Sequence, residues 1–187
     1  MEPYKDRERR GRALNVLGRM YRSGDGVPCN LQKAVTCFRE AAELGDVNGQ
    51  YRLGRMYQRG KEINRNSKEA ERWLRKAAKQ GHGKAQYSLG VLYEKGMGIP
   101  QDLKEAEKWK LKAAEQGEAR AQNYYGVKYA KGEGVRRDYK VAYMWLRLAA
   151  MRGNRMARKN IAILVKKMTS EQIADAKQKV SEWKSKN

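Results

Sequence analysis

Residues of the same kind recur at a constant interval of 36 along this chain. They are the glycines Gly18, Gly54, Gly90 and Gly126, the tyrosines Tyr21, Tyr57, Tyr93 and Tyr129, and the alanine pairs beginning at Ala41, Ala77, Ala113 and Ala149. A fixed period of this length is typical of proteins in which one supersecondary unit repeats and each copy stacks on the next. Because no insertion breaks the series, we expect four stacked units of equal length.

The first half of each unit is predicted to form an amphipathic helix. In the second unit this helix spans 47–59, where Gly49, Leu53 and Met56 fall at the i, i+4 and i+7 positions of one helical face. Gly60 follows directly, and a glycine at this place commonly ends a helix. Each unit therefore begins with a helix that can bury one face.

The second half of each unit is predicted to form another helix. In the second unit Asn66 is placed to cap this helix, and Glu69 completes a capping box three residues later. Asp102 and Glu105 repeat the pair in the third unit. Gly81 is placed just beyond the helix as its C-terminal glycine. We therefore expect an all-α fold built from helix-turn-helix units.

The ends of such a stack need polar or closing segments, because a terminal unit has only one neighbour. The segment 1–10 is rich in arginine and is predicted to be a polar N-terminal cap. The segment 154–187 is predicted to close the other end with two helices, the second running from a Thr169–Gln172 capping box to about Trp183. Between these segments, residues 11–153 hold the four repeats.

The repeated pattern A-x-x-x-L-G-x-x-Y-x-x-G-x-G-V, followed by K-A-x-x-W-x-x-K-A-A-x-x-G, resembles the Sel1-like repeat, a relative of the tetratricopeptide repeat. Residues 85–99 and 104–117 match it almost completely, and the resemblance covers about residues 11–168. It implies a right-handed α/α solenoid with units at approximately 11–46, 47–82, 83–118 and 119–154. It also implies an adaptor role, since members of the family act in signalling, secretion, envelope assembly and host interaction.

The chain departs from this pattern at three places. Cys37 stands where the other units have tryptophan, and Lys110 stands where they have phenylalanine or leucine. The loop 61–63 lacks the second glycine, which leaves its turn geometry open. We expect Cys37 to be buried and inert. We also expect Cys37 and Cys29 to remain reduced, because about two helical turns would separate them.

The chain carries 42 Lys and Arg against 21 Asp and Glu, a formal net charge of +21. A field of this size attracts acidic proteins, nucleic acids or anionic membranes, although a basic surface can also serve solubility alone. No apolar signal segment begins the sequence and no run is apolar enough to span a membrane. We therefore expect a cytoplasmic location, although a protein exported in mature form by a dedicated secretion system would look the same.

No residue pattern in the chain indicates catalysis, a cofactor or a metal site. The G-x-G motifs at 24–26, 96–98 and 132–134 recur between helices and lack the further residues of a phosphate-binding loop, so we interpret them as turns. The lone His82 falls at a helix start and is predicted to be a surface cap. Some cysteine-rich relatives of this repeat are assigned hydrolase activity, but this chain lacks their paired cysteines. We therefore predict a protein that is not an enzyme and uses no cofactor.

The resemblance to tetratricopeptide solenoids implies that five positions on the first helix of each unit line a concave groove. Of the 25 such positions, counting the closing helix, twelve are basic and only Glu94 is acidic. A solvated face without a function would mix both signs. We therefore predict a basic groove with the partner-binding residues Arg12, Asn15, Arg19, Arg22, Asn48, Tyr51, Arg55, Arg59, Lys84, Tyr87, Lys95, Arg120, Asn123, Lys131 and Lys159.

The predicted partner is an acidic protein or an extended acidic peptide. The groove arginines would bind its carboxylates, and the asparagines would hydrogen-bond its backbone. The tyrosines, together with Val91, Val127 and Ile163, would supply apolar contact. The alternative partner is a nucleic acid or another polyanion bound through its phosphates by the same cations. Two groove tyrosines make a sparse stacking platform for single strands, and no base-reading helix motif is present, which weighs against sequence-specific recognition of a nucleic acid. The protein is expected to act as a monomer.

Overall fold

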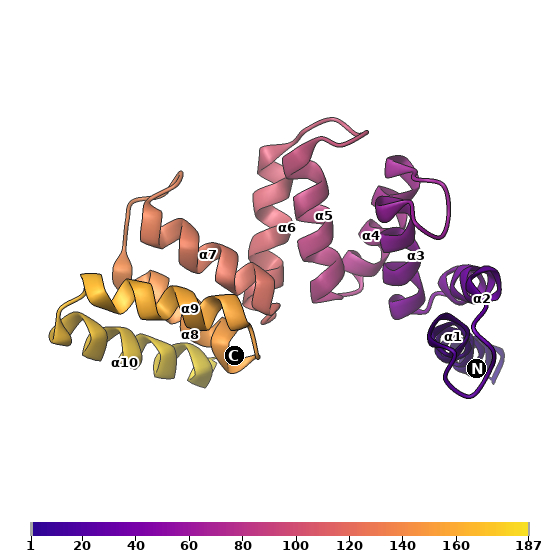
Figure 1. Cartoon of the computed structure of the whole chain (residues 1–187), viewed down its shortest axis with the longest axis horizontal. Coiled ribbons are helices and arrows are strands. Elements are labelled where there is room, and N and C mark those ends of the chain that lie inside the picture. Colours follow the sequence, from indigo (N-terminus) through magenta and orange to yellow (C-terminus); the bar gives the residue numbers. More distant parts are fainter. Residues whose placement is uncertain (1, 187) are drawn as a thin grey trace. The chain divides into compact units, whose positions relative to one another are not determined.

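The computed structural model describes the backbone of residues 2–186 and the side chains of residues 5–183 and 185. Over this range the regular structure is entirely helical, which confirms the predicted all-α fold. No helix in the same range is both long and apolar enough to cross a membrane. The α-helices, labelled in Figure 1, are α1 (Glu2–Ser23), α2 (Leu31–Glu43), α3 (Val47–Arg59), α4 (Ser67–Lys79), α5 (Gly83–Lys95), α6 (Leu103–Glu115), α7 (Ala119–Lys131), α8 (Tyr139–Met151), α9 (Arg155–Leu164) and α10 (Ser170–Lys186). The 3-10 turn η1 (Val165–Lys167) follows α9.

Helix α1 is longer than the other first helices because the polar segment at the N-terminus continues it. Residues 2–10 are helical, and the side chains of residues 5–10 are exposed. Arg7 bonds through Nη2 to the backbone oxygen of Glu43 at 3.1 Å, at the end of α2. The segment is therefore a polar extension of the first helix.

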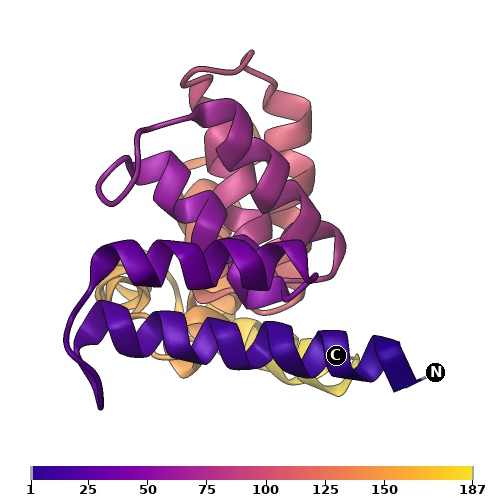
Figure 2. The same ribbon diagram turned by 90° about the vertical axis from the view of Figure 1, so that its right-hand side faces the viewer.

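The chain divides into two compact units, Met1–Lys110 and Leu111–Asn187. In the first unit α1 packs on α2 and α3 packs on α4, while α2 and α4 each pack on the first helix of the next pair. Figure 2 shows α1 and α2 lying side by side. Phe38, Leu74 and Leu89 are completely buried between these helices. Consecutive helix pairs therefore bury apolar faces against each other, as the repeat predicts.

In the second unit α7 packs on α8, and α8 also packs on α9 and α10. The ring centroids of Trp145 on α8 and Trp183 on α10 lie 6.1 Å apart. The capping box that opens α10 is confirmed in both directions. The backbone N–H of Thr169 donates to Gln172 Oε1 at 3.1 Å, and the backbone N–H of Gln172 donates to Thr169 Oγ1 at 3.2 Å. Helix α10 ends at Lys186, slightly beyond the predicted end.

The recurring tyrosines hold the start of each second helix through their backbone oxygens. The cap residues of the four units donate their backbone N–H to the tyrosine carbonyl near the end of the preceding first helix. These bonds are Asn30 to Tyr21 at 2.8 Å, and Asn66 to Tyr57, Asp102 to Tyr93 and Asp138 to Tyr129, each at 3.1 Å. The helix-turn-helix unit is thus closed by a backbone bond that the repeat conserves in every copy.

This bond explains why the capping boxes predicted at the second helices form only in part. Asn66 accepts from the backbone N–H of Glu69 at 3.1 Å, as expected for a cap. The Glu69 carboxylate does not return to the cap, because the cap N–H is already bonded to Tyr57. It accepts instead from the Trp73 indole at 3.0 Å. Glu105 behaves in the same way.

Small residues on the first helices allow a close approach to the second helices. A methyl group added at Gly54 would lie 2.9 Å from Leu74 Cγ and 3.0 Å from the Leu74 backbone nitrogen. The equivalent glycines, Gly18, Gly90 and Gly126, face Phe38, Lys110 and Leu146 in the same manner. These four glycines therefore recur because the two helices of each unit pack closely at this position, and not because they form turns.

The G-x-G motifs are turns, as predicted. Gly96 and Gly98 have φ values of 59° and 80°, and the other two motifs also place both glycines at positive φ. The second unit has Glu62 at the place of the second glycine, and every positive φ within the described range belongs to a glycine. The loop 61–63 therefore turns without a left-handed residue at this place, and Ile63 packs against the adjacent core.

Candidate partner-binding surface

The predicted partner-binding residues fall into two sets, one in each compact unit. We call the predicted positions on α1, α3, α5, α7 and α9 the first-helix face. Within the first unit α1 contacts α3 and α3 contacts α5, which brings eleven of the fifteen residues onto neighbouring helices. In the second unit α7 contacts α9, and these helices carry Arg120, Asn123, Lys131 and Lys159. The exposed members across both sets are Arg12, Arg19, Arg22, Asn48, Arg59, Lys84, Lys95, Arg120, Lys131 and Lys159.

Asn15 does not lie open on this face, and the expectation that it is available to a partner backbone is wrong. It is 8% exposed, and its Oδ1 accepts from Arg52 Nε at 3.0 Å. The same contact recurs in the second unit, where Asn160 Nδ2 donates to Asn123 Oδ1 at 3.0 Å. These amides join neighbouring first helices, so their oxygens serve the stack.

Arg52 is the residue of this surface that the sequence analysis missed. Its guanidinium carbon lies 5.5 Å from the centre of the Phe38 ring, and its Nε is held by Asn15. Burial lowers the pKa of Arg52, and the positive charges of Arg22 and then Arg19 lower it further. The surface between α1 and α3 therefore concentrates three guanidinium groups. The sequence did contain a signal for Arg52, because arginine occurs at this repeat position in one unit only.

The aromatic and polar residues of α3 are held by contacts within the unit. The ring of Tyr51 stacks on His82 with a centroid distance of 4.6 Å. His82 also accepts the backbone N–H of Ala85 through Nδ1 at 3.1 Å, so the predicted cap role is confirmed. Arg55 donates to Gln58 Oε1 at 2.7 Å. This part of the face is ordered before any partner binds.

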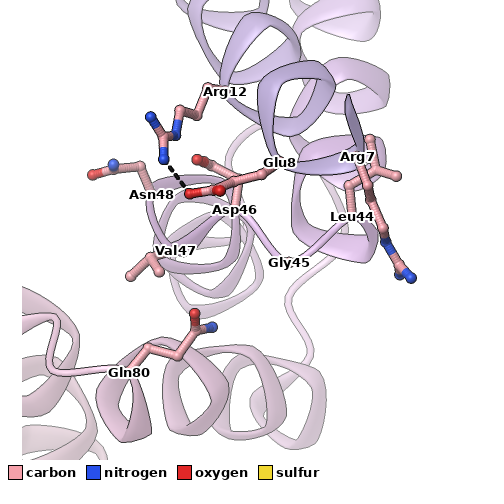
Figure 3. Close-up of a pocket in the computed structure, with 9 residues that line it drawn as sticks. All are labelled: Arg7, Glu8, Arg12, Leu44, Gly45, Asp46, Val47, Asn48 and Gln80. Atoms are coloured by element: carbon pink, nitrogen blue, oxygen red, sulfur yellow. Dashed lines mark hydrogen bonds and ion pairs between the residues drawn. The ribbon is translucent and has the colours of Figure 1, made fainter. Parts of the chain in front are cut away.

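A pocket of about 490 Å³ lies between the start of α1 and the link from α2 to α3 (Figure 3). Arg12 reaches Glu8 there and forms an ion pair with it. Asn48 lies beside this pair, and Gln80 is on the opposite side. Arg12 therefore brings its own counter-charge and is a weaker anion ligand than its exposure suggests. The lining residues are Arg7, Glu8, Arg12, Leu44, Gly45, Asp46, Val47, Asn48 and Gln80.

The second unit has a smaller, mainly apolar pocket of about 240 Å³ between α7, α8 and α9. Val127, Ile163 and Leu164 supply apolar lining, and Lys131 and Lys167 also line the pocket. Ile163 is 60% exposed, so its side chain is open to a ligand. The first-helix face of this unit thus combines apolar contact with lysine charge.

The single acidic residue of the first-helix face is occupied. Glu94 forms an ion pair with Lys110, whose side chain is 2% exposed. Arg120 and Lys131 also have acidic neighbours, Glu118 at 2.7 Å and Glu133 at 3.1 Å. The uncompensated charge of the face is therefore concentrated in the first unit.

The residues considered for chemistry occupy structural positions. Cys37 is buried, and burial followed by the charge of Glu40 raises the pKa of its thiol. Cys29 is an exposed free thiol with Sγ 3.7 Å from the backbone oxygen of Arg22. Among the described residues no group of three or more His, Cys, Asp or Glu could hold a metal ion.

Comparison with known proteins identifies the repeat. The sequence model of the Sel1 repeat matches residues 11–46, 47–82, 83–118 and 119–154. No curated protein sequence matches the chain significantly.

Three solved structures show where the similarity extends. A Sel1 repeat protein from Oxalobacter formigenes is 32% identical over 81% of this chain and 62% of its own, with a TM-score of 0.73. The protective antigen c5321 of uropathogenic Escherichia coli is 29% identical over 92% of this chain and 45% of its own, with a TM-score of 0.60. Cysteine-rich protein B of Helicobacter pylori is 26% identical over 70% of this chain and 94% of its own, with a TM-score of 0.54.

The chain therefore spans about half to two thirds of the length of the first two of these proteins. Four matched repeats cover residues 11–154, and the helices, caps and glycine contacts described above recur with the same period. The chain belongs to the Sel1 repeat family.

Proposed function

We propose that the protein is a non-catalytic adaptor whose first-helix face binds an acidic segment of a partner protein. The Sel1 repeat fold is typical of protein–protein interaction scaffolds. The observation that supports an acidic partner is the group of Arg19, Arg22 and Arg52 between α1 and α3, where burial and then the charges of Arg22 and Arg19 lower the pKa of Arg52. An anion that approaches such a group lowers its electrostatic free energy.

The ion pairs of the chain show which cations are available for this role. Some basic side chains of the second helices have carboxylate partners on their own helix, namely Arg72 with Glu69 at 3.3 Å, Arg75 with Glu71 at 2.7 Å and Lys108 with Glu105 at 2.6 Å. On the first-helix face of the first unit, five cations form no ion pair with any described residue. They are Arg19, Arg22, Arg59, Lys84 and Lys95.

Apolar groups beside these cations would add contact area. Tyr51 and Tyr87 are half-buried on α3 and α5, and tyrosine gives large contact area at low conformational cost. In the second unit the apolar pocket at Val127 and Ile163 is bordered by lysines. A partner segment that mixes acidic and apolar side chains suits both sets.

The proposal is tested with a fluorescein-labelled peptide of alternating acidic and apolar residues, followed by fluorescence anisotropy. The variant R19E/R22E/R59E reverses three exposed cations of the first-helix face. The control K68E/K79E/K104E reverses three exposed cations of α4 and α6 and changes the net charge equally. We expect the first variant to lose binding and the control to keep most of it, with both unfolding near the wild-type temperature.

Equal losses in the two variants would show that only net charge matters and would contradict the proposal. A single-stranded oligonucleotide of similar charge is the second probe. If it binds more tightly than the peptide, with log affinity falling steeply against log salt concentration, the partner is a polyanion such as nucleic acid. The adaptor role for an acidic protein would then be abandoned.

A further inference from the structure

We infer that Arg19, Arg22 and Arg52 form a site for a phosphoryl group carried by a phosphorylated side chain of the partner. This inference rests on the proposed function, because the phosphoryl group would belong to the same acidic partner segment. It goes further in naming one local site and the chemical group that fits it.

The geometry of Arg52 is fixed before binding. Its Nε donates to Asn15 Oδ1 at 3.0 Å, and its guanidinium lies over the Phe38 ring at 5.5 Å. Asn15 is 8% exposed and Phe38 is fully buried, so both supports are rigid. One N–H of Arg52 is used in this way, and the outer N–H groups of the fork remain available to a ligand. A guanidinium held in this manner loses less conformational entropy on binding an anion.

Arg19 and Arg22 share the helical face on which Arg52 is anchored. Asn15, Arg19 and Arg22 stand at i, i+4 and i+7 along α1, and residues with this spacing lie one above another. The Arg52 head, bound at Asn15, is therefore next to them. The positive charges of Arg22 and Arg19 lower the pKa of Arg52, which agrees with this closeness.

The acidic groups near this site do not neutralise it. Asp46 raises the pKa of Arg52, but its influence on that pKa is weaker than that of Arg22 or Arg19. The Asp46 carboxylate is also committed, because its Oδ1 caps α3 by accepting the Gly49 backbone N–H at 2.6 Å. The cluster therefore keeps a local excess of positive charge in the free protein.

A phosphoryl group matches this cluster better than one carboxylate does. A carboxylate presents two oxygens, which a single guanidinium fork can satisfy. A phosphorylated side chain presents three strong acceptor oxygens and close to two negative charges, and clusters of arginine are its usual ligands. Three neighbouring guanidinium groups can bind one phosphoryl group with several charge-assisted hydrogen bonds.

The cluster is a local feature and does not repeat with the fold. The positions equivalent to Arg52 hold Val16, Ser88, Tyr124 and Asn160. The positions equivalent to Arg19 are Arg55, Val91, Val127 and Ile163, so basic residues give way to apolar ones along the chain. Residues that stack the repeats recur every 36 positions, whereas this group occurs once. The contact between first helices accounts for the bond from Arg52 to Asn15, because Asn160 and Asn123 form it without arginine. It does not require three guanidinium groups at one place, and a bound anion would use all three.

The test uses one acidic peptide in three forms, with serine, phosphoserine or glutamate at a central position, and measures each dissociation constant by anisotropy. We expect the wild-type protein to prefer the phosphoserine form over the glutamate form by about tenfold or more. R52Q removes the charge, and its amide can still donate to Asn15. R52Q and R19Q/R22Q should each reduce this preference to about twofold or less, whereas K68Q on α4 should leave it unchanged.

Several outcomes would overturn the inference. Equal affinity of the wild-type protein for the phosphoserine and glutamate forms would remove the phosphoryl site and leave the adaptor function standing. An unchanged preference in R19Q/R22Q, which replaces only exposed side chains, would also remove it. Tighter binding of a 5′-phosphorylated oligonucleotide, lost in R52Q, would assign the site to a nucleic-acid phosphate instead. Failure of all three peptides to bind would overturn the inference and the proposed function together.

Discussion

Lys110 occupies a core position that is phenylalanine or leucine in the other three units. Its residue is 1% exposed, and its amine pairs with Glu94, whose side chain is 37% exposed. A buried ion pair is often no more stable than an apolar contact of similar size, because both charges lose their hydration. At this position the ion pair with Glu94 offsets part of the cost of burying the Lys110 charge.

Two substitutions separate these effects. K110L restores the residue found at Leu74 and Leu146 and leaves a carboxylate that water can reach, so we expect stability to be unchanged or higher. E94Q leaves a buried ammonium without its counter-charge and should lower stability by about 1–3 kcal/mol. Urea denaturation followed by far-UV circular dichroism measures both. A loss in K110L as large as that in E94Q would show that the ion pair itself stabilises the unit.

The two cysteines should differ in reactivity, because alkylation requires an accessible thiolate. Cys29 is exposed, whereas Cys37 is buried and its pKa is raised by that burial and by Glu40. A thiol with a raised pKa in the fold stabilises the protein at neutral pH, and this contribution is lost as pH rises above the ordinary thiol pKa. We expect iodoacetamide to label only Cys29 in the native protein. Mass spectrometry should detect no iodoacetamide label on the native C29S variant until denaturant is added. Rapid labelling of native C29S would show instead that Cys37 is accessible.

At the scale of helices, the contact between a first-helix glycine and the second helix sets the spacing of each pair. Replacing Gly54 with alanine raises intrinsic helix propensity by about 1 kcal/mol. The added methyl would nevertheless meet Leu74 at 2.9 Å, so we expect a net loss of about 1–3 kcal/mol. G11A is the comparison, because its methyl would lie 3.3 Å from a side-chain carbon and should cost less. If thermal melts show that G54A is as stable as the wild type, the close approach does not limit packing.

The second helices of the middle units share a link between glutamate and tryptophan. The Glu105 carboxylate accepts from Lys108 and from the Trp109 indole, and these bonds, the one from Lys108 first, lower the pKa of Glu105. A carboxyl group whose pKa is lower in the folded protein stabilises the fold at pH values above the pKa of the unfolded chain. This stabilisation is lost as the pH falls through the pKa of the folded protein. K108A should raise the Glu105 pKa in a carboxyl-carbon NMR titration. An unchanged value would mean that Lys108 does not hold this carboxylate.

The helical elements were predictable because their signals are local and repeated. Gly60, Gly81 and the cap Asn66 mark helix ends through chemistry that each residue carries by itself. The return of Glu69 to its cap was wrongly predicted, because the competing bond from Asn66 to Tyr57 crosses between helices. Contacts of that kind depend on how helices pack, which the pattern of one helix does not contain.

The candidate surface was predictable only in outline for the same reason. Sequence register places Arg19 and Arg22 on a basic face, and the structure leaves both exposed there. The sequence does not reveal that Arg52 reaches Asn15, because the two residues are 37 positions apart and lie on different helices. The buried glutamines Gln50, Gln86 and Gln122, which donate to carbonyls of the preceding second helix, also escaped notice despite their constant spacing.

At the scale of the whole molecule, a net charge of +21 draws any anion towards the protein. Attraction of this kind raises the rate of encounter and decreases with salt, but it does not choose a face. Specific recognition needs cations held in a fixed arrangement, as Arg52 is by Asn15 and Phe38. General electrostatic attraction is therefore distinct from binding at the first-helix face.

The most direct test is a map of backbone amide chemical-shift changes in the ¹⁵N-labelled protein as the acidic peptide is added at physiological salt. We expect the largest changes on the first helices of the first unit, around Arg19, Arg22 and Arg52 on α1 and α3, and smaller changes on α4 and α6. Changes spread evenly over first and second helices, or concentrated on the second helices, would contradict this expectation.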